Sequence, residues 1–272
     1  MTSKSERTIK DFGGQWTMFQ DNSGFYGSAA LFDDIFSPLL THTALAGQRV
    51  ADIGAGTGRF VNVFLDAGAT AVVAVEPSAA FDVLKKNTAG RAGRITYLNV
   101  TGDRIPPGLD LDYAFSIGVL HHIPEPGPVV AAVRRSLKRG GVCCAWVYGR
   151  ENNGAYLALV SALRAIARPM PSKLRAALAW LLYWPLMAYV ALARRARVPL
   201  GTYLTEVIGR LDPDKVRLVI YDQLNPAYAK YYRRDEVRRL FEQAGYTDVR
   251  IHHRHRYSWA VCAVRPPDDP AS

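Results

Sequence analysis

Residues 50–58 read VADIGAGTG, a short apolar run that leads into three alternating glycines. The apolar run predicts a buried strand, and the glycines predict a turn whose backbone approaches a ligand closely before the next helix begins. The dinucleotide-binding fingerprint fails because Arg59 stands where it needs glycine or alanine. The chain also has no glycine-rich phosphate loop ending in Gly-Lys-Ser/Thr. Asp52 precedes the first glycine, so the turn suits a ligand with cationic or hydroxyl groups better than a pyrophosphate.

Two further acidic residues follow the next two apolar runs. Glu76 ends AVVAVE, and Asp103 comes shortly after ITYLNV. Because the carboxyl ends of parallel strands meet at one edge of a sheet, Asp52, Glu76 and Asp103 are predicted to line one ligand site there. A carboxylate at the position of Glu76 suits ribose hydroxyls, and Asp103 suits an exocyclic amine.

Strand and helix patterns alternate between about residues 49 and 149, with short connections. The expected strands are 49–53, 71–76, 95–100, 112–120 and 141–149, and the expected helices are 59–68, 78–87 and 128–141. The runs are apolar on both faces, which predicts a parallel sheet covered by helices, a doubly wound α/β fold. Ser78 is a predicted helix N-cap. Helices joined by glycine turns near Gly13-Gly14 and Gly24 are expected in the first 45 residues.

Four motifs in order, VADIGAGTGRF, AVEPS, NVTGD and FSIGVLHHIPEP, resemble the class I S-adenosylmethionine-dependent methyltransferases of the small-molecule type, which include the ubiquinone-biosynthesis-like enzymes. The resemblance covers about residues 45–148 and extends to the tail from Ala244. It implies a Rossmann-like seven-stranded sheet with the last strand antiparallel. The expected parts are an N-terminal helical cap (1–44), the cofactor-binding core (45–149), a helical insertion after the fifth strand (150–232) and the end of the core (233–272).

The resemblance also implies which residues bind S-adenosylmethionine. The amino-acid part of the cofactor would be held by the turn, and the ribose and adenine by the residues after the next strands. FGGQWTMF resembles a segment found in a subset of these enzymes, so Gln15 and Trp16 would close over the cofactor, although Trp16 and Phe19 packing a helix on the domain explains the segment as well. The full predicted set is Asp52, Gly54, Ala55, Gly56, Gly58, Glu76, Pro77, Asp103, Ser116, Ile117, Gln15 and Trp16.

Two other stretches carry candidates for the chemistry. His121 and His122 follow the fourth strand, where a histidine near its usual pKa suits a general base, or where both only position the loop. The stretch from Tyr221 to Tyr228 suggests Asp222 and Tyr228 as substrate-binding residues, with a structural loop as the alternative. His253 and His255 would share a strand face, but a solvated basic strand is favoured over a metal site, so no metal is predicted.

Residues 176–193 contain no charged side chain, and basic residues flank them on both sides. A single membrane span is disfavoured, because it would put the two parts of one sheet on opposite sides of the membrane. Two interpretations remain for residues 173–197: a lid or oligomer contact, and an amphipathic segment on an anionic membrane surface. Trp180 and Trp184, four residues apart, share a helix face, as the second interpretation requires.

The composition supports a folded enzyme. Of 272 residues, 49% are hydrophobic, and the net charge is +10, with seven basic and one acidic side chain in residues 151–200 alone. Three cysteines are too few for a disulfide framework, so a reducing compartment is expected. The chain opens without an apolar signal segment, and we expect a cytoplasmic protein, soluble or peripheral on the inner face of a membrane.

Together these observations predict methyl transfer to a small-molecule acceptor, first a glycan or secondary-metabolite hydroxyl and second a lipid-like quinone or prenyl compound. A non-catalytic S-adenosylmethionine-binding protein and a nucleic-acid methyltransferase are the competing classes. The insertion is too apolar for a phosphate-binding surface, so a nucleic-acid partner is not expected. A homo-oligomer is compatible with the apolar insertion.

Overall fold

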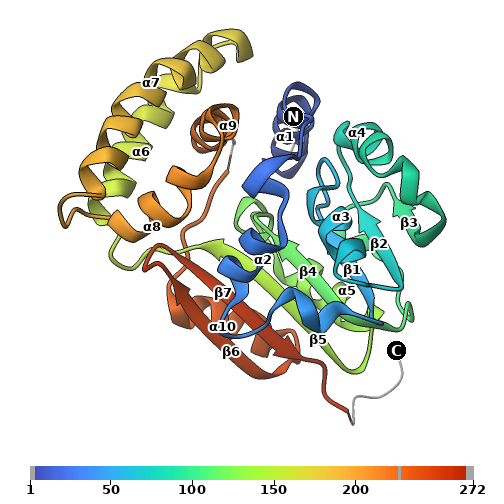
Figure 1. The fold of residues 1–272 in the computed structure, drawn as a ribbon. Coiled ribbons are helices and arrows are strands. Elements are labelled where there is room, and N and C mark those ends of the chain that lie inside the picture. The colour runs from blue at the N-terminus through green and yellow to red at the C-terminus, as the bar shows by residue number, and fades with distance from the viewer. Residues whose placement is uncertain (1–3, 226–227, 268–272) are drawn as a thin grey trace.

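The computed structural model describes residues 4–225 and 228–267. It contains one seven-stranded sheet in the order β3-β2-β1-β4-β5-β7-β6 (Figure 1). The strands are β1 (Arg49–Ile53), β2 (Ala71–Val75), β3 (Ile95–Leu98), β4 (Leu111–Ile117), β5 (Leu137–Tyr148), β6 (Thr247–Arg254) and β7 (Ser258–Val264). The neighbours from β3 to β5 are parallel, and β7 is antiparallel to both β5 and β6. The predicted Rossmann-like sheet with an antiparallel last strand is confirmed.

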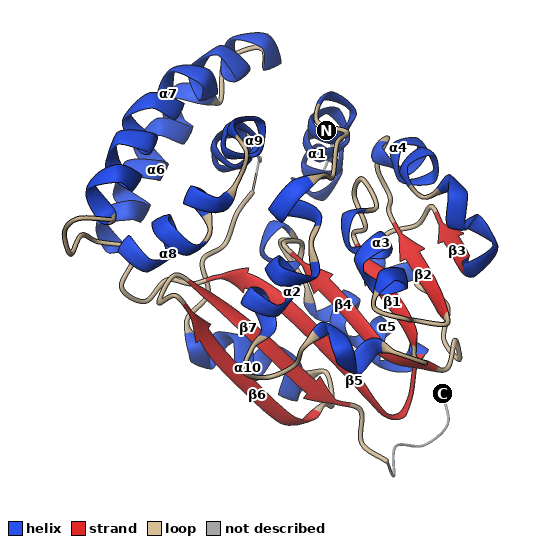
Figure 2. Cartoon of the chain, in the orientation of Figure 1, coloured by secondary structure: helices blue, strands red, loops and turns tan. Residues whose placement is uncertain are grey.

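Helices cover both faces of the sheet, as Figure 2 shows. The helices are α1 (Lys4–Met18), α2 (Ala29–Phe36), α3 (Arg59–Asp66), α4 (Ala80–Asn87), α5 (Gly127–Ser136), α6 (Gly154–Ala167), α7 (Ser172–Ala193), α8 (Gly201–Glu206), α9 (Pro213–Leu224) and α10 (Arg234–Gln243). Apolar side chains of α5 and α10 pack on one face, and those of α2 and α3 pack on the other. The sheet is therefore buried on both sides, which explains why its central strands lack a polar face.

The helical insertion forms a third apolar cluster of its own. Side chains of α6, α7, α8 and α9 pack together there, with Val190, Leu204, Val216 and Ile220 among the buried ones. In Figure 1 this group stands at the upper left, beyond the carboxyl ends of the parallel strands, and α1 lies between α9 and α4. The insertion and the N-terminal helix thus border the edge of the sheet where a ligand is expected.

The predicted glycine turn at Gly13-Gly14 is wrong, because both residues lie inside α1. A Cβ added to Gly13 would lie 3.1 Å from the backbone nitrogen of Ala79 and 3.2 Å from the Cβ of Ser78. The glycine therefore lets α1 approach the start of α4 closely rather than turning the chain. Gly24 does begin a turn, with a φ of +71°. The predicted N-cap is wrong by one residue, because Ala79 holds the N-cap position of α4 and has no side-chain capping bond. The Ser78 hydroxyl, one residue earlier, accepts a hydrogen bond from the Ala80 N–H at 3.1 Å.

The helix expected over 128–141 is too long. It ends at Ser136, and Leu137 starts β5 by pairing with Leu111. The following residues also bond to the residue after the neighbouring strand β7, since Gly140 donates its N–H to the Arg265 carbonyl and Arg265 donates its N–H to that of Gly141. These long-range bonds outweigh the helical pattern of the sequence, which is a local signal only.

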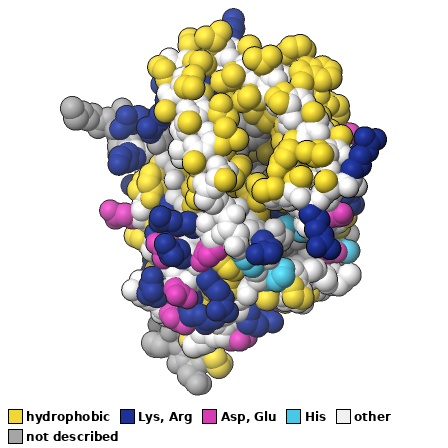
Figure 3. All heavy atoms as spheres, turned by 90° about the vertical axis from the view of Figure 1, so that its left-hand side faces the viewer, with side chains coloured by type: hydrophobic (Ala, Val, Ile, Leu, Met, Phe, Trp, Pro, Cys, Tyr) yellow, Lys and Arg dark blue, Asp and Glu magenta, His cyan; other side chains and the backbone are white. Residues whose placement is uncertain are grey.

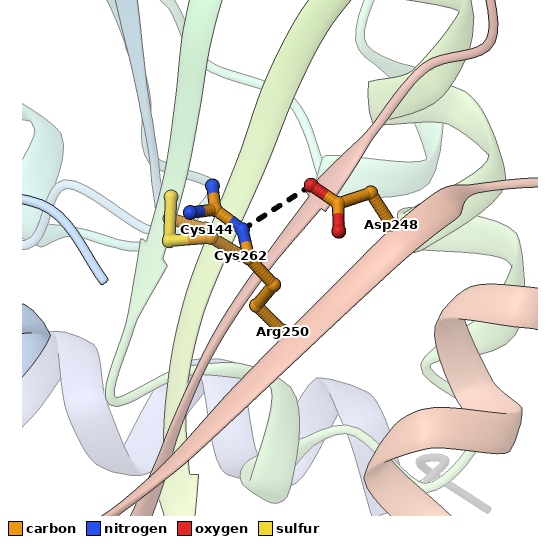
Figure 4. The surroundings of a disulfide bond; sticks show 4 residues. All are labelled: Cys144, Asp248, Arg250 and Cys262. Atoms are coloured by element: carbon orange, nitrogen blue, oxygen red, sulfur yellow. Dashed lines mark ion pairs between the residues drawn. A yellow bond between two sulfur atoms is a disulfide. The ribbon is translucent and has the colours of Figure 1, made fainter. Parts of the chain in front are cut away.

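A disulfide joins two of the three cysteines, which the sequence analysis did not anticipate. Cys144 in β5 and Cys262 in β7 are direct cross-strand partners with Cα atoms 4.2 Å apart. Figure 4 shows the bond with the Arg250–Asp248 ion pair of β6 beside it. Cys143 is unbonded and buried, and burial raises the pKa of its thiol to about 12. The cysteines are 118 positions apart in sequence, so only the sheet topology brings them together.

Candidate functional site

A cavity of about 770 Å³ runs along the carboxyl ends of the parallel strands. Its wall follows the order of the sheet, from Asp103 after β3 and Glu76 after β2, through the glycine turn after β1, to Ile117 and His122 at β4. It continues to Trp146 and Tyr148 of β5 and ends at Tyr257, just before β7. Helices α1 and α9 close it from above, with Trp16 and Asp222 among their lining residues. The volume is that of a ligand-sized site.

The glycine turn is shaped by close contacts on both sides. Gly54, Gly56 and Gly58 all have positive φ, at +79°, +54° and +81°. A Cβ on Gly54 would come within 2.5 Å of Val119, and one on Gly58 within 2.9 Å of Leu84. Gly56 faces the cavity beside the indole of Trp16, 3.4 Å from where its Cβ would lie. Gly58 is not among the residues that line the cavity, so its role is to let α3 and α4 pack closely.

The carboxylate of Glu76 holds the glycine turn in place through hydrogen bonds to backbone N–H groups. One carboxylate oxygen accepts the Gly56 N–H at 2.8 Å, and the other accepts the Ser78 N–H at 2.9 Å. Both bonds hold the side chain in place at the end of β2, where it lines the cavity. Each carboxylate oxygen keeps a second lone pair, so a ligand hydroxyl can still donate to Glu76.

Asp52 has a different environment, because it is buried without a hydrogen-bond partner among the described residues. Only 3% of the residue is exposed, and it lines the cavity. Burial raises the pKa of its carboxyl to about 7; the guanidinium of Arg59 lowers this pKa and Glu76 raises it. A buried carboxyl with an open side toward a cavity is suited to a cationic ligand group, which stabilises the ionised form. The α-amino group of S-adenosylmethionine is such a group, so these residues fit the predicted cofactor.

The predicted cofactor residues divide into those that line the cavity and those that support it. The lining set contains Trp16, Asp52, Gly54, Ala55, Gly56, Glu76, Pro77, Asp103 and Ile117. Gln15, Gly58 and Ser116 lie outside it. The Ser116 hydroxyl is buried without a hydrogen-bond partner among the described residues. Gln15, 1% exposed, bonds to Asp222 of α9 and to Asn225, which follows that helix. Nine of the twelve predicted residues therefore line one cavity, and the cofactor-binding role of all twelve stays a prediction.

The structure distinguishes the two adjacent histidines. His122 lines the cavity. It lies between the part lined by residues that follow β1, β2 and β3 and the part lined by residues of β5. Its Nδ1 lies 2.9 Å from the carbonyl oxygen of Tyr228, which can only accept, so Nδ1 carries the proton and Nε2 is an unprotonated acceptor. Burial lowers the pKa of His122, against the carboxylate of Asp222, so the ring is neutral at pH 7.

His121 is enclosed and does not line the cavity. Within the described part of the chain, neither of its buried ring nitrogens has a hydrogen-bond partner. The centroid of its ring lies 3.8 Å from that of the Tyr148 ring. Burial lowers its pKa well below the usual value. Its role in the fold is that of an aromatic packing residue.

The end of the cavity near β5 and β7 is aromatic. Tyr148, Tyr203 and Tyr257 line it together with Trp146, and the rings of Tyr203 and Tyr257 stack with centroids 4.2 Å apart. Burial raises the pKa of Tyr203 to about 12 and those of the other two tyrosines well above 10. All three phenols therefore stay protonated and can donate hydrogen bonds. No sequence motif marks these residues as site residues, although Tyr148 stands at the carboxyl end of β5, where ligand-binding residues are expected.

A hydrogen-bond chain connects this aromatic end to the helices above it. Asp222 of α9 accepts from the Tyr148 hydroxyl at 2.9 Å and from the Gln15 side-chain amide at 3.0 Å. Asn225 donates to the Gln15 amide oxygen at 3.0 Å. Asp222 thus lines the cavity, whereas Tyr228 contributes its carbonyl oxygen to His122 and is not a lining residue. The substrate-binding role of Asp222 stays a prediction. Pro226 and Ala227, within the predicted substrate stretch, lie outside the described residues.

The last strand pair holds no histidine pair on one face. β6 ends at Arg254, and His255 lies in the following turn with a φ of +48°, so the expectation that His253 and His255 share a strand face is wrong. His255 bonds to Asp34 at 2.7 Å, and Arg254 pairs with the same carboxylate. His253 stacks on Trp259 with centroids 3.9 Å apart. Within the ranges that the structure describes, no three His, Cys, Asp or Glu side chains form a metal-binding group.

The comparisons with known proteins agree with this geometry. Residues 51–143 match a family model described as a methyltransferase domain. The ubiquinone biosynthesis O-methyltransferase of Methylococcus capsulatus is 29% identical over 133 residues, which are 47% of this chain and 56% of that protein. The tRNA U34 carboxymethyltransferase of Chromohalobacter salexigens is 35% identical over 103 residues, 36% of this chain and 31% of that protein. The chain thus spans between about a third and just over half of these relatives.

Solved structures share the fold across most of the chain. A SAM-dependent methyltransferase from Aquifex aeolicus superposes with a TM-score of 0.53 at 15% identity, covering 93% of this chain and 97% of that one. A putative O-methyltransferase from Nostoc punctiforme gives a TM-score of 0.51 at 14% identity, over 87% of this chain and 55% of that one. With the motifs, the sheet order and the Asp52–Glu76 edge already described, these findings place the chain among proteins with a class I S-adenosylmethionine-dependent methyltransferase domain.

Proposed function

We propose that this protein transfers a methyl group from S-adenosylmethionine to a hydroxyl oxygen of a small molecule, with His122 as the general base. The observation that carries the proposal is the hydrogen bond from His122 Nδ1 to the Tyr228 carbonyl, which leaves Nε2 free to take a proton. His122 also lies where the cofactor end of the cavity meets the aromatic end. A base in that position can deprotonate an acceptor at the moment of transfer.

When bound, the cofactor supplies an electrophilic methyl group on a positively charged sulfur. The chain's own residues bind and align the reactants. Asp52 would hold the amino-acid part and Glu76 the ribose hydroxyls. Asp103, exposed at the end of the cavity, would hold the adenine amine. His122 would take the proton of the acceptor hydroxyl at Nε2 as that oxygen receives the methyl group.

The aromatic end of the cavity favours an acceptor with a ring. Trp146, Tyr148 and Tyr257 offer flat surfaces on which a sugar or an aromatic ring can stack, and the tyrosine hydroxyls can bond to its polar groups. A hydroxyl of a glycan or secondary metabolite therefore remains the first candidate. A lipid-like acceptor is the second candidate, since the apolar insertion packs directly on α9, which lines the cavity. A nucleic-acid acceptor is not proposed, because the similarity to the tRNA U34 carboxymethyltransferase extends over only 36% of this chain and 31% of that protein.

The test compares two matched variants. Radiolabelled S-adenosylmethionine is offered with panels of sugars, phenols and prenylated quinols to the wild type, His122→Gln and His121→Phe. We expect His122→Gln to lower kcat by about 10²–10⁴-fold while cofactor affinity stays unchanged. His121→Phe should keep its activity, because it replaces a ring whose nitrogens bond to none of the residues that the structure describes.

Three results would contradict the proposal. Unchanged kcat in His122→Gln would exclude the base role. Loss of activity in His121→Phe, with normal stability, would assign the general-base role to His121 instead of His122. Tight cofactor binding without turnover on any panel compound would favour the non-catalytic alternative.

A further inference from the structure

The outer faces of α6 and α7 are apolar and uncovered. Among the described residues, eight large hydrophobic side chains are highly exposed, and all but Met18 belong to these two helices. On α7 the exposed apolar side chains return to one face of the helix at each turn and form a continuous stripe: Leu174, Ala177, Trp180, Leu181, Trp184, Pro185, Ala188, Ala191 and Leu192. Figure 3 shows the hydrophobic side chains massed over the upper part of this side of the molecule. A patch of this extent marks an interaction surface.

The stripe is the outer side of a helix whose inner side is fixed to the domain. Ala179 and Val190 are buried in the cluster with Leu204 and Val216, which belong to α8 and α9. Among the described helices, α7 is long and apolar enough to cross a membrane, but only 11% of its most apolar window is buried in the protein. A core helix would be mostly buried, and a helix that spanned a membrane would lose its contacts with α9. Instead, α7 is held as a helix with one packed and one open face.

Cationic side chains border the stripe at both ends. Residues 152–205 contain seven Lys and Arg and no Asp or Glu. Lys173 precedes the stripe, and Arg194, Arg195 and Arg197 follow it, all of them exposed. A second copy of the chain is a poor occupant, because a two-fold interface would bring the same patch, with the same cations and no acids, against itself. An anionic lipid surface satisfies both the apolar stripe and its cationic ends.

We propose that α6 and α7 bind the surface of an anionic lipid bilayer, with α7 lying in the plane of the interface. Trp180 and Trp184, with ring centroids 6.2 Å apart, enter the headgroup region, and the flanking arginines and Lys173 pair with lipid phosphates. Binding of this kind needs no methyl transfer, so it stands independently of the proposed function.

The geometry also brings the cavity close to the bilayer. α9 packs on α7 through Val216 and Ile220 and lines the cavity with Leu218 and Asp222. One helix layer, about 10 Å thick, therefore separates the lipid-facing helix from the site. An amphipathic acceptor dissolved in the bilayer would have a short path to His122.

The test is flotation of the full chain with vesicles. Vesicles of phosphatidylcholine alone are compared with vesicles that also contain phosphatidylglycerol, at low and high salt. We expect the wild type to float with the anionic vesicles, at least tenfold less with the neutral ones, and less at high salt. The variant Trp180→Ser, Leu181→Ser, Trp184→Ser should lose binding by at least tenfold, and it changes only exposed side chains, so its circular dichroism should match the wild type.

Matched controls separate the stripe from general effects. Met18→Ser removes an exposed apolar side chain from α1 and should leave flotation unchanged. Arg195→Glu with Arg197→Glu should weaken binding about tenfold or more. Arg94→Glu with Arg139→Glu makes the same charge change at exposed positions away from α7 and should have little effect.

Three outcomes would overturn the proposal: no flotation of folded wild type with anionic vesicles, equal flotation of the wild type and the triple serine variant, or equal losses in the two arginine pairs. A wild-type dimer in light scattering that becomes a monomer in the serine variant, without vesicle binding, would assign the face to a second copy instead.

Discussion

Cofactor affinity should depend on pH because of Asp52. In the ligand-free protein, burial raises the pKa of this carboxyl to about 7, and its open side faces the cavity. Only the ionised carboxylate attracts the cationic α-amino group of the cofactor. Below pH 7, binding must therefore first remove a proton from Asp52, so affinity falls as the pH falls and levels off above neutral pH.

The size of the effect follows from the ionised fraction. With a pKa of about 7, about 90% of Asp52 is ionised at pH 8 and about 3% at pH 5.5, so the affinity should fall about 30-fold between these values. Calorimetric titration with S-adenosylhomocysteine across this range measures it directly. Repeating the titration in two buffers with different ionisation enthalpies should show close to one proton released per ligand bound at pH 5.5.

5′-Methylthioadenosine provides the control, because it keeps the adenosine part and lacks the amino-acid part. Its affinity should be nearly independent of pH. The difference between the two ligands then isolates the effect of Asp52 on the amino-acid part from any effect of Glu76 or the histidines on the adenosine part. Asp52→Asn should bind S-adenosylhomocysteine weakly and with a flat profile. A flat profile for the wild type, or the same slope for both ligands, would refute the assigned contact between Asp52 and the amino group.

Three further predictions concern stability and rate. Ionised Asp52 destabilises the ligand-free fold by about 4 kcal/mol above pH 7, and this penalty disappears below the unfolded-state pKa of Asp52, near 3.8. Scanning calorimetry should therefore show that Asp52→Asn raises Tm at pH 8 and raises it much less at pH 5. Burial lowers the pKa of His122, so kcat should stay constant from pH 8 to below 6.5 and fall only when His122 protonates; a decline starting above pH 7 would contradict the neutral base. Reduction, or Cys144→Ala with Cys262→Ala, should lower the free energy of unfolding by up to about 5 kcal/mol, as expected for a closed loop of 118 residues; an unchanged denaturation midpoint would show that the disulfide adds no stability.

The cofactor half of the molecule could be predicted because its signals are local. An apolar strand, a glycine turn and an acid after each strand lie within a few residues of one another, and parallel topology brings Asp52, Glu76 and Asp103 to one edge. The errors arose where long-range contacts decide. Gly13 serves a close approach to Ala79, and Leu137 leaves the helical pattern to pair with Leu111.

The acceptor half could not be assembled from the sequence. Tyr148, Tyr203 and Tyr257 come from β5, the insertion and the last turn, and no spacing rule links them. The choice between His121 and His122 depends on the direction of a single 3₁₀ turn, Leu120–His122, and on a carbonyl more than a hundred residues later. Cys144 and Cys262 meet only because β7 inserts between β5 and β6.

The helix α9 connects the two proposals physically. One side of it packs on α7, and the other side carries Asp222, which accepts from Tyr148 of the sheet and from Gln15 of α1. A force on α7 from the bilayer would therefore act on the helix that closes the cavity and on the tyrosine that packs beside the histidines. The hydrogen bonds of Asp222 hold α1 and α9 together over the site. Entry of an acceptor between these helices must compete with those bonds, so contact with lipid at α7 is well placed to influence access to His122.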